Sequence, residues 1–181
     1  MRVYQKRPDL GAVVHAHPTF ATSFAIAGIP LTQPIMPEAV IALGYVPITP
    51  YGTPSTMEIP DAIEPYLEHF DAVLLESHGA LTWSTDVLAA YMKMESVEFY
   101  AELLYKARQL GGAKEFDKEN IRKLYEVRKK MEIPGRHPAD LSMDKEMVKD
   151  NGSICDFVKS NDDKQELIKE ITKRVMEQLG K

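Results

Sequence analysis

The chain has 181 residues and a mass of 20.4 kDa, and 44% of its residues are hydrophobic, which suits one globular domain with a substantial core. Its net charge of -5 argues against nucleic acid as a partner. Cys155 is the single cysteine, which excludes a disulfide within the chain and fits a reducing cytoplasm. No apolar run approaches the roughly 18 residues of a membrane span, and His15 and His17 interrupt the only apolar stretch that a signal peptide could use. We expect a cytoplasmic protein that binds neither nucleic acid nor membrane.

Strand-like and helix-like segments alternate through the first part of the chain. Residues 12–17 predict a short buried strand that Pro18 stops, and residues 19–27 predict the helix that follows it. A second short helix is expected over residues 37–43. Residues 46–54 hold too many prolines for a central strand and predict an edge strand or an extended loop.

The alternation continues toward the middle of the chain. Residues 60–69 predict a helix, residues 71–76 a second buried strand, and residues 86–110 a long helix. The apolar face expected for the long helix comprises Val87, Tyr91, Met94, Val97, Ala101 and Leu104. A charged helix is expected over residues 117–131. Strands that alternate with helices indicate a layered α/β fold.

The histidines are the main candidates for chemistry. His15 and His17 are two residues apart in a predicted strand, so both side chains leave the same face. His78 follows the second buried strand and can supply a third ligand if the two strands are neighbours, with Gly79 allowing a tight turn beside it. Three histidines with one open position suit a catalytic zinc ion. From spacing alone, an ordinary strand or surface pair of histidines remains the more common explanation.

Three segments, residues 7–18, 50–58 and 74–83, resemble in order the motifs of the class II aldolase/adducin family, in particular its L-fuculose-1-phosphate aldolases. The resemblance implies that His15, His17 and His78 bind zinc. It also implies a three-layer αβα sandwich and a homotetramer with sites between subunits. The implied reaction is zinc-dependent cleavage of a deoxyketose 1-phosphate, such as L-fuculose 1-phosphate, into dihydroxyacetone phosphate and an aldehyde.

The sequence departs from this family at its beginning. In the family, a catalytic glutamate and the loops that grip the substrate phosphate precede the first histidine motif, whereas here the match begins almost at Met1. The fold is therefore expected to be N-terminally truncated. Either Met1 is an internal start within a longer protein or the chain is a truncated paralogue. We assign no catalytic or substrate-binding residue, and we expect no aldolase turnover from the 181-residue chain alone.

Other functions stay open beside the lyase. A sugar-phosphate 4-epimerase or a dehydratase of the same fold would use the same zinc site, because the acid and base residues that distinguish them lie in missing or divergent places. A non-catalytic binding or scaffold paralogue is the alternative from another class. The three histidines favour the enzyme, and the missing N-terminal portion favours the scaffold.

The C-terminal part carries a separate prediction. We divide the chain into an aldolase-like domain over residues 1–131, a linker over residues 132–161 and an amphipathic helix over residues 162–181. Such a terminal helix resembles the encapsulation peptides of bacterial microcompartment cargo enzymes, which would place the protein inside a microcompartment through a shell or cargo contact. Packing of this helix on its own oligomer is the alternative. His137 is expected in a solvated turn.

Overall fold

A four-stranded mixed sheet forms the centre of the molecule. The computed structural model describes residues 1–138. The strands are β1 (Ala12–Ala16), β2 (Ile48–Thr49), β3 (Ala72–Leu75) and β4 (Gly79–Ser84), in the spatial order β1-β4-β3-β2. β4 is antiparallel to both β1 and β3, whereas β2 runs parallel to β3 at the sheet edge. The predicted edge strand and the strands predicted over residues 12–17 and 71–76 are confirmed, and β3 is fully buried as predicted. The prediction that the first strand is buried is wrong, because β1 is the other edge strand and only its Ala12 is buried.

The strand β4 is a feature that the sequence pattern did not predict. All six of its residues are buried, although Thr82 and Ser84 are polar. The Thr82 hydroxyl donates to the carbonyl oxygen of Ala90 at 2.8 Å, so a polar side chain is accommodated under a helix. β4 lies between β1 and β3, and this position brings together the ends of strands that are far apart in the sequence.

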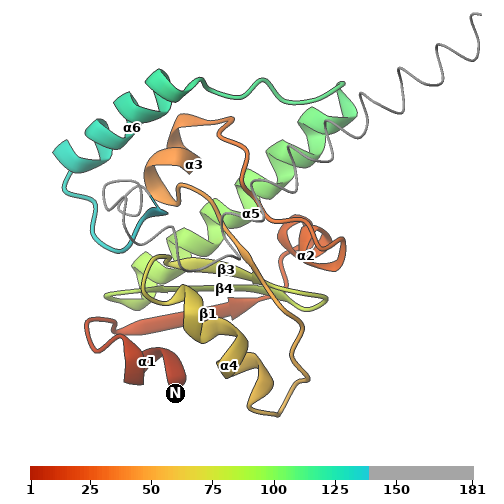
Figure 1. Cartoon of the computed structure of the whole chain (residues 1–181), viewed down its shortest axis with the longest axis vertical. Helices are drawn as coiled ribbons and strands as arrows, with labels where there is room; N and C mark the ends of the chain where they lie inside the picture. Colours follow the sequence, from red (N-terminus) through yellow and green to blue (C-terminus); the bar gives the residue numbers. More distant parts are fainter. Residues whose placement is uncertain (139–181) are drawn as a thin grey trace, which may run out of the picture. The chain divides into compact units, whose positions relative to one another are not determined.

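Helices cover both faces of the sheet, as Figure 1 shows. One face is covered by α2 (Thr19–Ile26), α3 (Pro37–Ala42) and α5 (Val87–Gln109). The other face is covered by α1 (Arg2–Lys6), α4 (Glu58–Ile63) and the 3-10 helix η1 (Glu64–Tyr66). The arrangement is the predicted αβα sandwich.

Each face of the sheet has its own apolar core. Because side chains alternate along a strand, Leu74 and Ala80 belong to the core under α2 and α5, and Val73 and Trp83 belong to the core under α4. The Trp83 indole Nε1 donates to the carbonyl oxygen of Phe70 at 2.9 Å, which satisfies its one polar atom inside the core.

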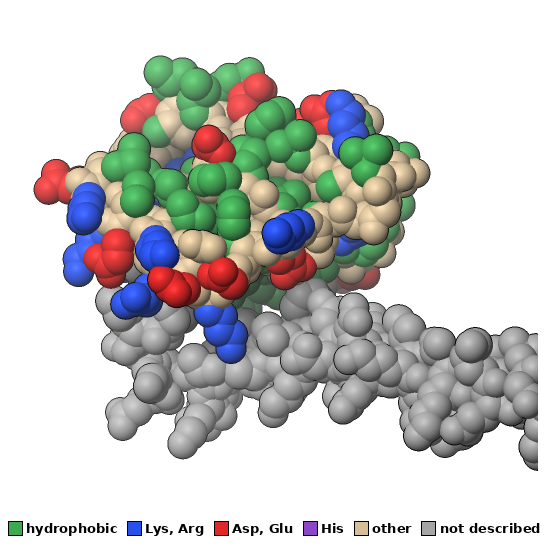
Figure 2. Space-filling view, turned by 90° about the horizontal axis from the view of Figure 1, so that it is seen from above, with side chains coloured by type: hydrophobic (Ala, Val, Ile, Leu, Met, Phe, Trp, Pro, Cys, Tyr) green, Lys and Arg blue, Asp and Glu red, His purple; other side chains and the backbone are tan. Residues whose placement is uncertain are grey.

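The apolar face predicted for α5 is correct only in part. The buried residues of α5 are Ala90, Met94, Val97, Tyr100, Ala101 and Leu104. Val87 and Tyr91 are exposed, because the first turn of the helix and the flank of the apolar stripe extend beyond the core. Leu88, Met92 and Phe99 are exposed too, so α5 also presents apolar side chains to solvent. Figure 2 shows hydrophobic side chains spread over one face of the molecule between charged ones.

The end of the described chain packs on the domain. α6 (Lys118–Lys130) is followed by an irregular segment in which His137 is only 1% exposed. Its Nε2 is hydrogen-bonded to the carbonyl oxygen of Val40 at 2.8 Å, and its ring packs edge-on against Tyr125. The prediction of a solvated turn at His137 is therefore wrong, because tertiary contacts bury a segment whose composition is typical of a turn.

Residues 139–181 lie outside the described part of the chain. The rest of the predicted linker, Cys155 and the predicted C-terminal helix over residues 162–181 fall there, so the domain boundaries and the microcompartment contact stay predictions. Among the described residues, every helix is too short or too polar to cross a membrane.

Candidate metal centre

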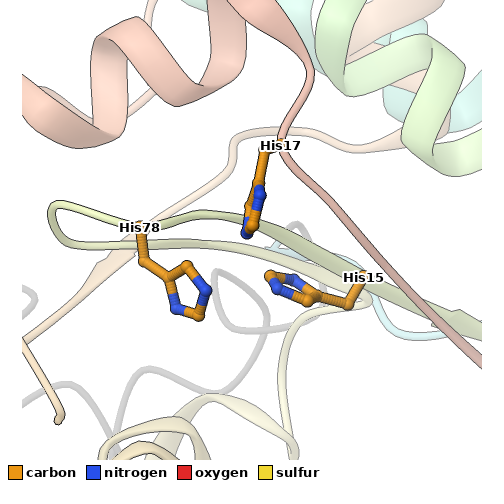
Figure 3. A group of neighbouring side chains, drawn as sticks. All are labelled: His15, His17 and His78. Atoms are coloured by element: carbon orange, nitrogen blue, oxygen red, sulfur yellow. The ribbon is translucent and has the colours of Figure 1, made fainter. Parts of the chain in front are cut away.

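Three histidines from two neighbouring strand ends converge at one edge of the sheet. His15 is in β1, His17 follows the end of that strand, and His78 lies in the turn between β3 and β4. Since Ala16 of β1 pairs with Ala80 of β4, the end of β1 lies beside the start of β4 and therefore beside His78. In Figure 3 the three rings point toward a common space.

The distances between the rings fit a shared ligand. The ring centroids are 4.8 Å apart for His15 and His17, 4.8 Å for His15 and His78, and 4.9 Å for His17 and His78. One nitrogen from each ring can be chosen so that all three lie within 4.8 Å of one another. With zinc–nitrogen bonds of about 2.0–2.1 Å, one ion would reach all three after the side chains rotate toward it.

The orientation of His15 is fixed by a backbone group. Its Nδ1 lies 2.9 Å from the carbonyl oxygen of Ala80. Because a carbonyl oxygen only accepts hydrogen bonds, this contact requires the proton on Nδ1 and leaves the lone pair on Nε2. A ring nitrogen that donates to a carbonyl while the other faces outward is the arrangement that metal-ligating histidines use.

His78 carries an unsatisfied polar atom. Its Nδ1 is buried and has no hydrogen-bond partner among the described residues. Burial, followed by the neighbouring His15 and His17, lowers the pKa of His78, so its ring is neutral at pH 7. A buried nitrogen without a partner is costly, and coordination of a cation by the neutral ring would satisfy it. The donor set therefore fits a transition-metal ion such as zinc.

The turn that carries His78 depends on two residues, for different reasons. Ser77, with φ of 56°, takes the left-handed conformation in this turn. Gly79 has another role, because a Cβ atom there would lie 2.5 Å from Cδ2 of His17 and 2.6 Å from the carbonyl oxygen of Ala16. We expected Gly79 to let the backbone turn tightly, but it is needed for the close approach of His17.

The carboxylates nearest in sequence to these motifs hold backbone groups. Glu76 accepts from the Tyr51 N–H at 2.8 Å, and Glu58 accepts from the Thr53 N–H at 2.8 Å. The hydrogen bonds from Thr53 lower the pKa of Glu58. These contacts shape the loop that precedes α4. Among the described residues, no Asp or Glu joins the three histidines in one metal-ligating group.

One contact close to the histidines was missed by sequence reasoning. Glu98 of α5 accepts hydrogen bonds from the backbone N–H groups of Phe20 and Ala21, in the first turn of α2. The available signal was Pro18, whose side chain has no atom that can cap the helix that it precedes. Such a helix start requires an acceptor from another element.

The family of the chain follows from comparison with known proteins. Residues 1–105 match the family described as Class II Aldolase and Adducin N-terminal domain. The chain belongs to this family. A solved structure named L-fuculose 1-phosphate aldolase superposes with a TM-score of 0.64 at 30% sequence identity, over 70% of this chain and 59% of that one. The predicted family and fold are confirmed.

Curated relatives carry the names of two kinds of enzyme. An L-fuculose phosphate aldolase of Methanococcus maripaludis is 29% identical over 61% of this chain and 60% of its own length. A 5-deoxy-D-ribulose 1-phosphate aldolase of Bacillus thuringiensis is 32% identical over 68% of this chain and 59% of its own. A 3-oxo-tetronate 4-phosphate decarboxylase of Pectobacterium atrosepticum is 28% identical over 58% and 50%. The chain thus spans about three fifths of the length of the two aldolases and half of that of the decarboxylase.

Proposed function

We propose that the protein is a zinc-dependent lyase that cleaves a deoxyketose 1-phosphate, such as L-fuculose 1-phosphate, to dihydroxyacetone phosphate and an aldehyde. The observation that carries the proposal is the convergence of His15, His17 and His78 within a class II aldolase domain. The names of the aldolase relatives support a sugar phosphate as the substrate.

The three histidines would hold the ion and leave a coordination position open for substrate. When bound, zinc supplies Lewis acidity, which polarises a carbonyl and stabilises developing negative charge. His15 presents Nε2 because its Nδ1 is bound to the Ala80 carbonyl, and His78 presents a neutral ring at pH 7. The neutral ring of His78 can therefore bind a cation without first losing a proton.

Cleavage of the carbon–carbon bond also requires a base. The hydroxyl beside the scissile bond loses its proton, the bond breaks toward the carbonyl, and the resulting carbanion takes up a proton to give dihydroxyacetone phosphate. Glu58 and Glu76 accept backbone hydrogen bonds in the preceding loop, so we assign neither of them this role. The proposal assigns metal binding to this chain and leaves the base unassigned.

A decarboxylase of the same family is the second candidate, because two of the curated relatives carry the name 3-oxo-tetronate 4-phosphate decarboxylase. Both reactions break the bond between the carbon next to a ketone and the following carbon. In both, the negative charge is left on the carbon next to the ketone. The histidine triad serves either reaction equally well. The two differ in the leaving product, which is an aldehyde in one case and carbon dioxide in the other.

The test begins with zinc titration of the full chain, where we expect one ion per chain. The native protein, isolated from its source cells and measured by intact mass against 20.4 kDa, is then assayed with L-fuculose 1-phosphate and with 3-oxo-tetronate 4-phosphate. Zinc-dependent release of an aldehyde together with dihydroxyacetone phosphate from L-fuculose 1-phosphate supports the lyase. Release of carbon dioxide from 3-oxo-tetronate 4-phosphate, without cleavage of L-fuculose 1-phosphate, replaces it with the decarboxylase. Metal binding without turnover in a native protein of 20.4 kDa favours a non-catalytic paralogue.

We also propose that the protein acts as a homo-oligomer, a tetramer by family resemblance. The exposed apolar residues Leu88, Met92 and Phe99 on α5 support a contact with a second copy, because clustered apolar surface is typical of such interfaces. Light scattering of the full chain measures its mass directly. A monomer at micromolar concentration would contradict this part of the proposal.

A further inference from the structure

The helix α2 begins immediately after the segment that carries His17, and it has no cap of its own. Its N-cap residue is Pro18, which makes no side-chain hydrogen bond to the helix. The first backbone N–H groups of a helix have no partner within it, and a proline side chain offers no acceptor for them. The N–H groups of Phe20 and Ala21 therefore need an acceptor from elsewhere in the fold.

Glu98 of α5 supplies that acceptor with both of its oxygens. Oε1 accepts from the Phe20 N–H at 2.9 Å, and Oε2 accepts from the Ala21 N–H at 2.8 Å. These hydrogen bonds involve a charged acceptor at the positive end of a helix, so both the bond strength and the helix dipole favour them. Glu98 is itself held in place, because Val97 and Ala101 beside it are fully buried in the core.

The contact has a consequence for His17. On one side, the ring and the preceding backbone of His17 approach the β3–β4 turn so closely that Gly79 has no room for a side chain. On the other side, the chain is fixed three residues later, at Phe20, by Glu98. His17 itself is exposed, so packing in a core does not hold it. Its position therefore depends on the backbone at both ends, that is, on the pairing of Ala16 with Ala80 before it and on the Glu98 contact at Phe20 after it.

We propose that Glu98 is a positioning residue for the metal centre: by capping α2 it holds His17 at the place where its ring meets His15 and His78. The inference rests on the proposed zinc site. Glu98 touches neither substrate nor metal in this role and acts through the backbone of residues 18–21.

The experiment compares Glu98→Ala and Glu98→Gln with wild type, each as the full chain. Zinc affinity is measured by competition with a chromophoric chelator, and the geometry of the site by the visible absorption of bound cobalt(II). Since support residues around metal ligands typically change affinity by about 10–100-fold, we expect about a tenfold loss for Glu98→Ala. Glu98→Gln keeps one acceptor oxygen and should lie between Glu98→Ala and wild type, with a cobalt spectrum nearer to wild type.

Two control variants separate positioning from stability. Val97→Ala removes buried methyl groups from the adjacent residue and lowers stability while leaving the Glu98 carboxylate unchanged. Glu102→Gln removes a carboxylate one turn further along α5, where it pairs with Lys106 at the surface. Both should keep wild-type zinc affinity and cobalt absorption.

Wild-type affinity and spectrum in Glu98→Ala would overturn the inference, as would an equal loss of affinity in Val97→Ala. If Glu98→Ala does not fold, Glu98→Gln decides by the same criteria. An absence of zinc binding by the wild-type chain would instead overturn the proposed function together with the inference.

Discussion

Two clusters of ionisable side chains lie on the same sheet and are built in opposite ways. Asp71, just before β3, is buried, and its Oδ2 accepts from the Lys93 ammonium at 2.6 Å and from the Arg136 backbone N–H at 2.9 Å. Its Oδ1 lies 3.5 Å from a guanidinium nitrogen of Arg7, which also pairs with Asp9. Each charge in this cluster has a partner within the domain.

The histidine triad shows the reverse. His15 and His17 are exposed, and the buried Nδ1 of His78 has no hydrogen-bond partner among the described residues. A saturated polar cluster stabilises a fold and offers nothing to a ligand, whereas convergent atoms with free lone pairs can bind one. The difference predicts that damage to the Asp71 cluster lowers stability and that damage to the triad lowers metal affinity.

The largest effect is expected from Asp71→Ala. The substitution leaves Arg7 and Lys93 without their buried partner, and breaking a buried ion pair from one side costs about 3–5 kcal/mol of unfolding free energy. Urea denaturation measures the loss. Asp61→Ala is the matched control, since Asp61 pairs with Arg2 at the surface and its removal should cost under about 1 kcal/mol. Equal losses in both variants would contradict the structural role of Asp71.

His78→Ala should produce the next largest effect, and this effect is on zinc affinity rather than on stability. A four-ligand zinc site typically provides about 10–16 kcal/mol, so one lost ligand should reduce zinc affinity by about a hundredfold or more. Stability of the metal-free protein should change little or increase, because an unsatisfied buried nitrogen is removed. His69→Ala is the control, since His69 lies outside the triad. Zinc affinity that survives His78→Ala unchanged would exclude the triad as the site.

Gly79→Ala tests whether the triad requires the close approach of His17. The added Cβ would meet His17 Cδ2 at 2.5 Å and the Ala16 carbonyl oxygen at 2.6 Å, and the backbone oxygen cannot rotate away. We expect zinc affinity to fall by roughly tenfold, the range seen when support around metal ligands is disturbed. Gly112→Ala is the comparison, because it strains the backbone at φ of 117° in open space. It should lower stability alone, as measured by thermal unfolding.

A smaller, graded effect is expected from pH. Because the pKa of His78 is lowered from 6.5, its ring is neutral throughout the range above that value, and protons do not compete with metal there. Protonation of the ring competes only as pH falls toward its lowered pKa, so zinc affinity should decrease toward acid. Titrations at a series of pH values measure the trend. An affinity that rises on acidification would contradict binding through neutral histidines.

Much of the local structure could be predicted from the sequence. Pro18 stops the first strand and starts α2, and the two-residue spacing of His15 and His17 places both on one side of the chain, because these are properties of neighbouring residues. The metal centre required one step more. Its third residue, His78, can join the other two only if β1 lies beside the turn before β4. The sequence does not show that these segments are neighbours, whereas the structure does.

The remaining features were decided only by the tertiary structure. β4 has no clear pattern because it is central and covered on both faces, so the hydroxyl of Thr82 finds its partner in the helix α5 rather than in water. His137 is buried by contacts with Val40, which belongs to α3 and is distant in the sequence, and with Tyr125 of α6. Glu98 caps a helix that begins 79 residues before it, counting from Thr19.

The sequence by itself determined the family, the alternation of elements and the histidine candidates, because these rest on local pattern and motif. Contacts between distant segments decide that the groups around Asp71 all have partners and that the histidine nitrogens can bind a ligand. Only the folded chain brings those segments together.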